Sequence, residues 1–323
     1  MSKIVVVGSF VQDLAFLTPQ FPTVGETRIG TFFPGPGGKG FNQAVAAARL
    51  QPGTEFIGAV GNDVFSETAR SFAKSVGLTN LLEVVEGESC GAASILVDEN
   101  GDNQIVVSLG ANSVLSSDWI KGNLASFQSS SVVLCQLEAN LSAIQTALAL
   151  GRESGAATIL NLAPINQDLK PDLVGMADIV TPNETEFAFV YQLLTGKSLP
   201  SDYFETSDEE LHFLCRELNV PVVVITLGKM GSFISVDPDK LPQALSLAGS
   251  PYQRFSCIEA DAIDTSGAGD AFNGGLAAGL VRFGGDLVQA MKFASVVAGL
   301  SVEKRGTAPA MPTLAEVEAR QAL

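Results

Sequence analysis

The sequence predicts an α/β fold in which helices flank a mainly parallel central sheet, and three observations support this. Short apolar, β-branched runs alternate with longer Ala-rich or amphipathic segments along most of the 323 residues, which is the pattern of strand and helix units. Apolar residues make up 46% of the chain and charged residues 17%, so a large core is available. Two segments interrupt the alternation and predict a second, small sheet. We expect residues 1–323 to form a single domain.

Six strands are expected in the central sheet. Each is a short run dominated by Val, Ile, Leu and Ala, as in strands of a parallel sheet that helices cover on both faces. They span residues 3–10, 55–61, 132–138, 157–164, 178–183 and 221–228.

Helices are expected between these strands, where the segments are longer and amphipathic or Ala-rich. They span residues 42–50, 66–76, 141–153, 185–194 and 208–218. After the last strand, residues 231–236 predict a hairpin arm and residues 237–253 an irregular stretch. Three helical segments are expected from there to the C-terminus.

The small sheet is expected to come from about residues 14–34 and 89–110. The first segment is too rich in Pro and Gly for a helix that crosses between strands. The second reads as two strands around Asn100-Gly101, a strong hairpin signal. We expect these pieces to pair as an antiparallel sheet that acts as a lid.

Composition excludes several classes of partner. Lys and Arg number 19 against 35 Asp and Glu, for a net charge of −16, which argues against nucleic acid and against anionic membrane surfaces. No run approaches the roughly 20 apolar residues of a membrane helix, and the N-terminus does not resemble a signal peptide.

Cysteine and histidine chemistry is not indicated either. The four cysteines are scattered without a CxxC pair, so neither a zinc site nor a disulfide framework is expected, and a reducing cytoplasm fits best. They are Cys90, Cys135, Cys215 and Cys257. The single histidine, His212, falls in an amphipathic helix and is expected on its surface. Catalysis is therefore expected to use carboxylates.

The Gly-rich segment 264–280 carries the strongest chemical signal. Gly267, Ala268 and Gly269 have little side chain, so their backbone amides can approach a ligand closely at the start of an Ala-rich helix. Free amides at a helix N-terminus form an anion site. Asp270 falls in the first turn of that helix. The alternative is a glycine turn with a capping aspartate.

A second Gly-rich segment, 34–50, matches nucleotide motifs only superficially. Gly35, Gly37 and Gly40 satisfy GxGxxG, but about 25 residues separate them from the first strand, where a dinucleotide fingerprint belongs. This is the only support for an NAD-dependent oxidoreductase. A phosphate-binding Walker loop fails as well, because Phe33 occupies its glycine position.

Three carboxylates and one side-chain amide lie at or just after the ends of predicted strands. Asn183 and Glu186 stand three residues apart where a strand enters a helix, which suits a site near phosphate or hydrated Mg²⁺ and equally suits a capping box. Glu138 closes one apolar strand and Asp13 follows the first strand. Open α/β sheets bind ligands at that edge, although solvated or capping roles are as common.

These motifs together resemble the ribokinase-like (PfkB) carbohydrate kinases nearly end to end. The segments GGKGFNQAVAAARL, TPNETE, DTSGAGDAFNG and VEKRGTAP occur in the family's order. The resemblance implies a Rossmann-like domain, a β-sheet lid that clasps the lid of a partner in a homodimer, and ATP-dependent phosphorylation of a primary sugar hydroxyl. That hydroxyl is the 5-OH if the substrate is D-ribose, which the resemblance favours.

The resemblance also implies roles for individual residues. Asp270 would be the general base, with Gly267, Ala268 and Gly269 as an anion hole. Sugar contacts are implied for Asp13, Gly38, Lys39, Asn42, Glu138 and Asp270. Nucleotide contacts are implied for Asn183, Glu186, Thr226, Gly228, Gly231, Gly269 and Ser295, and Glu186 would also hold the water shell of Mg²⁺. A monovalent cation, usually K⁺, would be bound by oxygens of Asp264, Ser266, Ser301, Lys304, Gly306 and Ala310.

One departure bears on the sugar. Where many members of this family have an Asn that contacts the sugar, this chain has Val11. A branched aliphatic side chain makes no hydrogen bond to a hydroxyl, so selectivity between sugars is less secure than kinase activity. Fructokinase, keto-deoxy sugar kinase and nucleoside kinase activities stay open as alternatives.

Overall fold

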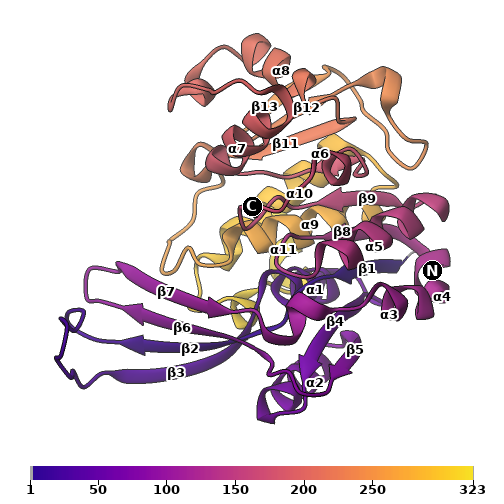
Figure 1. Cartoon of the computed structure of the whole chain (residues 1–323). Coiled ribbons are helices and arrows are strands. Elements are labelled where there is room, and N and C mark those ends of the chain that lie inside the picture. The colour runs from indigo at the N-terminus through magenta and orange to yellow at the C-terminus, as the bar shows by residue number, and fades with distance from the viewer. Residues whose placement is uncertain (1–2, 323) are drawn as a thin grey trace.

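The computed structural model describes residues 3–322, and the larger of its two sheets has nine strands. They are β1 (Lys3–Val7), β4 (Glu55–Gly61), β5 (Thr79–Val85), β8 (Ser130–Cys135), β9 (Ala157–Leu160), β10 (Ile179–Val180), β11 (Val222–Thr226), β12 (Ser232–Val236) and β13 (Tyr252–Phe255). Their order is β13-β12-β11-β10-β9-β8-β1-β4-β5 (Figure 1). Only β12 pairs antiparallel, with β11 and with β13. The predicted mainly parallel sheet is confirmed.

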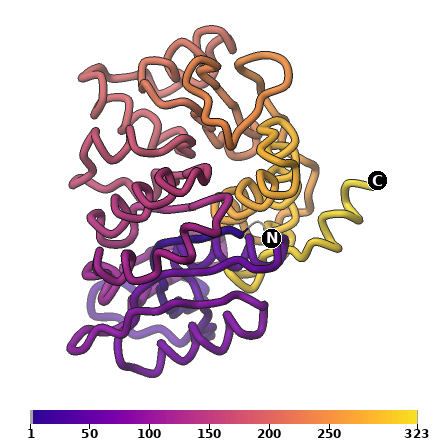
Figure 2. The backbone as a smooth tube through the Cα atoms, turned by 90° about the vertical axis from the view of Figure 1, so that its right-hand side faces the viewer, coloured from indigo at the N-terminus to yellow at the C-terminus, as the bar shows by residue number. Residues whose placement is uncertain are grey.

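Helices cover both faces of this sheet, as the two helical layers in Figure 2 show. Alternate residues of β1 point to opposite faces. Ile4 and Val6 pack with α1 (Lys39–Leu50), α2 (Val64–Ser75), α9 (Ala268–Arg282) and α10 (Leu287–Ser301). Val5 and Val7 pack with α3 (Ser117–Gly122), α4 (Leu124–Gln128), α5 (Leu141–Glu153), α6 (Pro171–Val174), α7 (Glu184–Thr195) and α8 (Asp208–Glu217). The last helix is α11 (Leu314–Gln321).

The smaller sheet extends away from the body of the molecule (Figure 1). Its strands are β2 (Val11–Leu17), β3 (Thr31–Gly37), β6 (Gly91–Val97) and β7 (Asn103–Ser108), in the order β3-β2-β6-β7. The expectation of a purely antiparallel sheet is wrong at its centre, where β2 and β6 run parallel. The reason is that β2 continues from β1 and β6 continues from β5. In the large sheet, β1 and β5 both run parallel to β4, so they enter the small sheet in the same direction.

The chain passes from the large sheet to the small one at residues 8–10. The first strand ends at Val7 rather than at residue 10, and Asn112 then binds both backbone groups of Phe10, accepting from its N–H and donating to its carbonyl. Asn112 thus substitutes for a neighbouring strand at the crossing. Asp13 consequently lies within β2 and not at the end of the first strand, which corrects the sequence prediction.

Several other elements differ from the prediction. Strands β5 and β13 and helices α3, α4 and α6 were not predicted, and α1 begins three residues earlier than expected. His212 is half-buried in α8, where its Nδ1 lies 2.7 Å from Ser235 Oγ. All four cysteines are free. Within residues 3–322, no helix has the length and apolar content that a membrane crossing requires.

Candidate active site

Several of the sequence-predicted residues lie at the carboxyl edge of the large sheet. Glu138 follows β8, Asn183 follows β10, and Thr226 ends β11, and these strands run parallel. The carboxyl ends of parallel strands meet at one edge, where open α/β sheets bind their ligands. Helices α1, α7 and α9 begin at this edge, and the small sheet adjoins it through β2.

Asp270 is a buried carboxylate at this edge. It lies in the first turn of α9, only 7% exposed. Its Oδ2 accepts from Asn42 Nδ2 (2.9 Å) and its Oδ1 from Gln43 Nε2 (2.9 Å). Burial raises the pKa of Asp270, while the positive charge of Lys39 and the two amide donors act in the opposite direction. The site holds a strong proton acceptor in a fixed orientation.

The turn before Asp270 presents backbone amides. Gly267 caps α9 in the left-handed conformation (φ 76°), and no side chain caps the helix. A Cβ built on Gly269 would meet no atom within 4 Å, so the backbone there faces open space. The Ala268 N–H donates to the Thr265 carbonyl (3.3 Å). Amides without a side-chain cap at the start of a 15-residue helix suit an anion such as a phosphate group.

Glu138 holds the start of α1 in place. Its Oε2 accepts from Ser9 Oγ (2.6 Å) and from the backbone N–H of Lys39 (2.9 Å), the first residue of the helix. A carboxylate at this position accepts a hydrogen bond from a free amide, and its negative charge interacts favourably with the positive end of the helix dipole. Burial opposes the charge of Lys39, but Asp270, Glu138 and Glu186 outweigh it and raise the pKa of the lysine. Lys39 therefore stays charged among these carboxylates.

Asp13 approaches the site from the small sheet. Its Oδ2 accepts from Thr307 Oγ1 (3.3 Å). Burial raises its pKa to about 6, partly offset by the Thr307 hydrogen bond and reinforced by Glu138 and Asp270. Val11 lies two residues earlier, on the same face of β2, and is 2% exposed. Val11 therefore adds no hydrogen-bonding group to the face that carries Asp13.

Asn183 and Glu186 form the capping box that the sequence left open. Asn183 Oδ1 accepts from the Glu186 N–H, and Glu186 Oε2 accepts from the Asn183 N–H, both at 2.8 Å. Burial raises the pKa of Glu186, against the effect of the backbone hydrogen bond and of Lys39. A bridge between Asn183 and Thr226 joins this cap to the end of β11.

The remaining nucleotide candidates lie around the turn after β11 and on α10. Gly228 and Gly231 both have positive φ, at 51° and 90°, and the Leu227 N–H donates to the Gly231 carbonyl. Ser295 lies on α10, where its hydroxyl donates to the carbonyl of Met291.

Two of the cation candidates, Ser266 and Gly306, contact the carboxylate of a third, Asp264. Asp264 Oδ1 accepts from the Ser266 N–H and Oδ2 from the Gly306 N–H, both at 2.9 Å. The Lys304 ammonium pairs with Glu316, so only the backbone of Lys304 could serve as a ligand. Within residues 3–322 no group of three or more His, Cys, Asp or Glu side chains is placed to hold a metal ion. Ser301 and Ala310 are both buried in this part of the chain.

Sequence reasoning missed three residues that organise the site, namely Ser9, Gln43 and Thr307. Gln43 and Thr307 lie inside family motifs and Ser9 lies in the first predicted strand, but their polar side chains carry no signal of which partner they bind. The GxGxxG match is accidental: Gly35 and Gly37 lie in β3 and Gly40 in α1, so the pattern does not follow β1.

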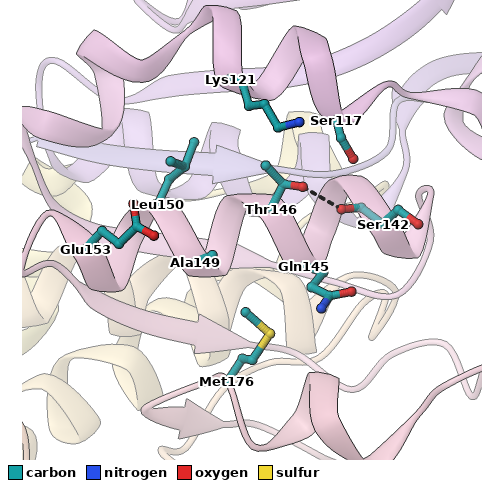
Figure 3. Close-up of a pocket in the computed structure, with 9 residues that line it drawn as sticks. All are labelled: Ser117, Lys121, Ser142, Gln145, Thr146, Ala149, Leu150, Glu153 and Met176. Carbon is teal, nitrogen blue, oxygen red and sulfur yellow. Dashed lines mark hydrogen bonds between the residues drawn. The ribbon is translucent and has the colours of Figure 1, made fainter.

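A surface hollow of about 520 Å³ lies away from this edge, and none of the site residues described above lines it. It lies along α3 and α5, beside Met176, and its walls mix hydroxyl and aliphatic groups with the side chains of Lys121, Gln145 and Glu153 (Figure 3). Thr146 Oγ1, which lines it, donates to the Ser142 carbonyl of its own helix. The hollow offers no arrangement of groups for catalysis.

Comparison with known proteins identifies the family to which the chain belongs. The model of the pfkB family carbohydrate kinases matches residues 1–314. A ribokinase of Haemophilus influenzae is 34% identical over 313 residues, covering 96% of this chain and 95% of that protein. A deoxyribokinase of Salmonella typhi is 33% identical over 313 residues, covering 96% of each. The structure of an Arabidopsis thaliana ribokinase complexed with ribose and ATP matches with a TM-score of 0.81 at 29% identity, covering 99% of this chain and 98% of that one. The chain therefore belongs to the pfkB family of carbohydrate kinases and is a ribokinase-like sugar kinase.

Proposed function

We propose that the protein phosphorylates a primary sugar hydroxyl with ATP, most readily converting D-ribose to D-ribose 5-phosphate. The observation that carries this proposal is the buried Asp270 carboxylate directly beside the open amide turn at Gly269. A base and an anion site on adjacent residues are what transfer of a phosphoryl group to a hydroxyl requires. The relatives named ribokinase, and the Arabidopsis structure with ribose and ATP, support the choice of sugar and donor.

Each residue of the edge has a task in this proposal. Asp270 takes the proton of the attacking hydroxyl, and the amides of Gly267, Ala268 and Gly269 hydrogen-bond to the phosphoryl oxygens. Lys39 holds a positive charge near the transferred group. ATP with Mg²⁺ supplies the γ-phosphoryl group. Closure of the small sheet over the sugar excludes water, which is the competing acceptor.

The sugar would be bound by the groups around Asp270. Asn42 Oδ1 is buried and has no hydrogen-bond partner, a state that costs about 1–3 kcal/mol until an O–H donates to it. A sugar hydroxyl would satisfy this oxygen. The other proposed sugar contacts are Asp13, Gly38, Lys39 and Glu138.

Oxygen ligands dominate the proposed nucleotide and ion sites. Asn183, Thr226, Gly228, Gly231 and Ser295 are proposed for the nucleotide. Glu186 offers a buried carboxylate of the kind that holds hydrated Mg²⁺. The group around Asp264 offers a carboxylate and backbone carbonyls, the donors that suit K⁺.

Two further properties belong to the proposal. The chain forms a homodimer through the small sheet, whose apolar residues are exposed. The free cysteines agree with a reducing cytoplasm as its location.

A 2-deoxy sugar is a second candidate substrate. Val11 presents an aliphatic side chain beside Asp13, so a sugar that lacks one hydroxyl loses no hydrogen bond there. One relative is named deoxyribokinase. Fructose, keto-deoxy sugar acids and nucleosides have no comparable observation in their favour.

The direct test is a panel of pentoses, deoxypentoses, hexoses and nucleosides with ATP and Mg²⁺, with and without K⁺. D-ribose is expected to give the highest kcat/KM. Asp270→Asn should lower kcat by about 10²- to 10⁴-fold while ATP still binds, because the base is lost and the amide turn is kept. Near-wild-type turnover in this variant would remove Asp270 from the role of base.

A further inference from the structure

A buried layer of side-chain amides lies directly beneath Asp270. Gln43 has no exposed surface. Its Nε2 donates to Asp270 Oδ1 (2.9 Å) and to Asn161 Oδ1 (3.1 Å), and its Oε1 accepts from Gln136 Nε2 (2.7 Å). Gln136 is also fully buried. The orientation of the Gln43 amide is therefore determined, since its oxygen is held by Gln136 and only its NH₂ can face the carboxylate.

The layer continues to the amide turn. Asn161 Nδ2 donates to the carbonyl (2.7 Å) and to Oγ1 (3.2 Å) of Thr181. Thr181 Oγ1 donates to Asn273 Oδ1 (2.5 Å), and Asn273 Nδ2 donates to the carbonyl of Gly269 (2.8 Å). The hydrogen bonds thus run from the carboxylate of Asp270 back to the peptide that precedes it. The base and the turn are attached to a single buried network.

The two amides on Asp270 are not equivalent. Asn42 carries a buried oxygen without a partner and is proposed to bind the sugar, so its contact with Asp270 changes when the sugar enters. Gln43 is remote from solvent, and its polar atoms are all engaged by protein groups. It can hold Asp270 throughout the reaction. Because it is neutral, it stabilises the carboxylate without the full opposite charge that would make the base too weak.

We propose that Gln43, oriented by Gln136 and Asn161, is a positioning residue that keeps the Asp270 carboxylate directed at the sugar and in register with the amide turn at Gly269. This inference rests on the proposed function, because it assigns Asp270 the role of base. Removal of the Gln43 donor leaves Asp270 Oδ1 buried without its partner, so the carboxylate both turns more freely and binds its proton more tightly.

The substitution that tests this proposal, Gln43→Leu, leaves the other charged groups around Asp270 in place. Lys39 and Glu138 face it from the start of α1 and the end of β8, Asp13 from β2, and Glu186 from α7. Gln43→Leu changes none of them, since it removes the amide and keeps a side chain of similar size. Any shift in the titration of Asp270 is then due to the lost hydrogen bond.

The kinetic test compares wild type and Gln43→Leu over a range of pH. We expect kcat for the sugar to fall about 10- to 100-fold, the KM for ATP to stay within about twofold, and the acidic limb of the kcat/KM profile to move to higher pH. Gln136→Met should give a smaller change in the same direction, and the double variant should lose no more than Gln43→Leu alone. The acidic limb is compared in an Asp13→Asn background, because Asp13 itself titrates at about pH 6. An acidic limb that Gln43→Leu leaves unmoved in that background would overturn the proposal, because a merely structural loss lowers activity equally at every pH.

A second readout needs no substrate. Infrared titration of the free protein follows the carboxyl band of Asp270, identified by its absence in Asp270→Asn. We expect Gln43→Leu to raise the pH at which this band titrates, and an identical titration would refute the proposal. If Gln43→Leu fails to fold, Gln136→Met is read in the same two ways. Failure of the wild type to phosphorylate any sugar would refute the proposed function and leave this titration unaffected.

Discussion

At the scale of single residues, the protonation of Asp13 is the feature most open to measurement. Burial in the site raises the pKa of this carboxyl from 3.8 to about 6. Above pH 6 the side chain is charged and, in the proposed function, would accept hydrogen bonds from sugar hydroxyls. Below pH 6, half or more of the Asp13 side chains are protonated. The same shift means that the folded protein holds this proton more tightly than the unfolded chain does. The charged form therefore lowers stability above pH 6, and this loss disappears as the pH falls below about 4.

Asp13→Asn should accordingly separate binding from stability. We expect a higher KM for the sugar, because an amide replaces one acceptor by a donor, together with a higher Tm at pH 7.5. The gain in Tm should be nearly absent at pH 4. Thermal unfolding at the two pH values measures this, with Asp118→Asn on the exposed surface of α3 as the control. A lower Tm at pH 7.5 would contradict the raised pKa.

Substitution of Gly269 by Ala is predicted to lower activity without lowering stability. Its backbone is helical and a Cβ there meets no atom, so Gly269→Ala should leave Tm unchanged or raise it. The added methyl group stands where phosphate oxygens have to approach the amides, so kcat should fall by at least about tenfold. Gly122→Ala, at another helical glycine with open space, is the matched control. Full activity of Gly269→Ala would argue against an anion site at this turn.

Motifs on loops at strand ends could be found in the sequence because their residue types are unusual there. Glu138 is of this kind. Asp270 is indicated by the glycine turn before it, and Asn42 only by the family resemblance. Gln43, Ser9 and Thr307 could not be assigned partners, because each binds a group far away in the sequence. The Gln43 and Asp270 contact spans 227 residues, and neither residue type nor spacing encodes such a pair.

At the scale of elements, apolar patterning located the buried strands and missed the edge ones. The β1 and β8 strands are covered on both faces and read as continuous apolar runs. The β5 and β13 strands lie at the two edges of the large sheet and contain polar residues, as in the sequence TNLLEVV of β5. The parallel pairing of β2 with β6 depends on how two distant strands leave the large sheet, which local sequence does not determine.

The β6 and β7 hairpin gives the prediction at this scale. Replacing residues 92–108 with a short Gly-Ser linker should raise ATP hydrolysis relative to sugar phosphorylation, because water then reaches the site. The ratio of ADP formed to sugar phosphate formed measures this, with circular dichroism to check the fold. If the ratio is unchanged in a folded variant, the hairpin does not seal the site.

At the scale of the whole molecule, the small sheet has an unpartnered apolar face. Phe16 and Phe32 pair across β2 and β3 with ring centroids 4.9 Å apart, and they are 40% and 48% exposed. They point away from the face that carries Asp13, and Val106, 75% exposed, lies on the same outer side. A face of this kind suits the same face of a second copy.

We therefore expect the protein to be a dimer in solution and the double variant Phe16→Glu, Phe32→Glu to be monomeric, since charges buried in the contact destabilise it. Light scattering coupled to gel filtration measures the mass. Phe213→Glu, at a phenylalanine of α8 that is 65% exposed, should leave the dimer intact. Equal masses for wild type and the double variant would show that the small sheet is not the interface.

The hydrogen bond between Asp13 and Thr307 joins residues 294 positions apart. During synthesis the N-terminal segments leave the ribosome first and can begin to pack, but this bond has to wait until Thr307 has been synthesised. Contacts of such long range also slow folding. The contact between Asp13 and Thr307 is therefore a late one, and a nascent chain stalled before Thr307 would leave the Asp13 carboxylate without this partner.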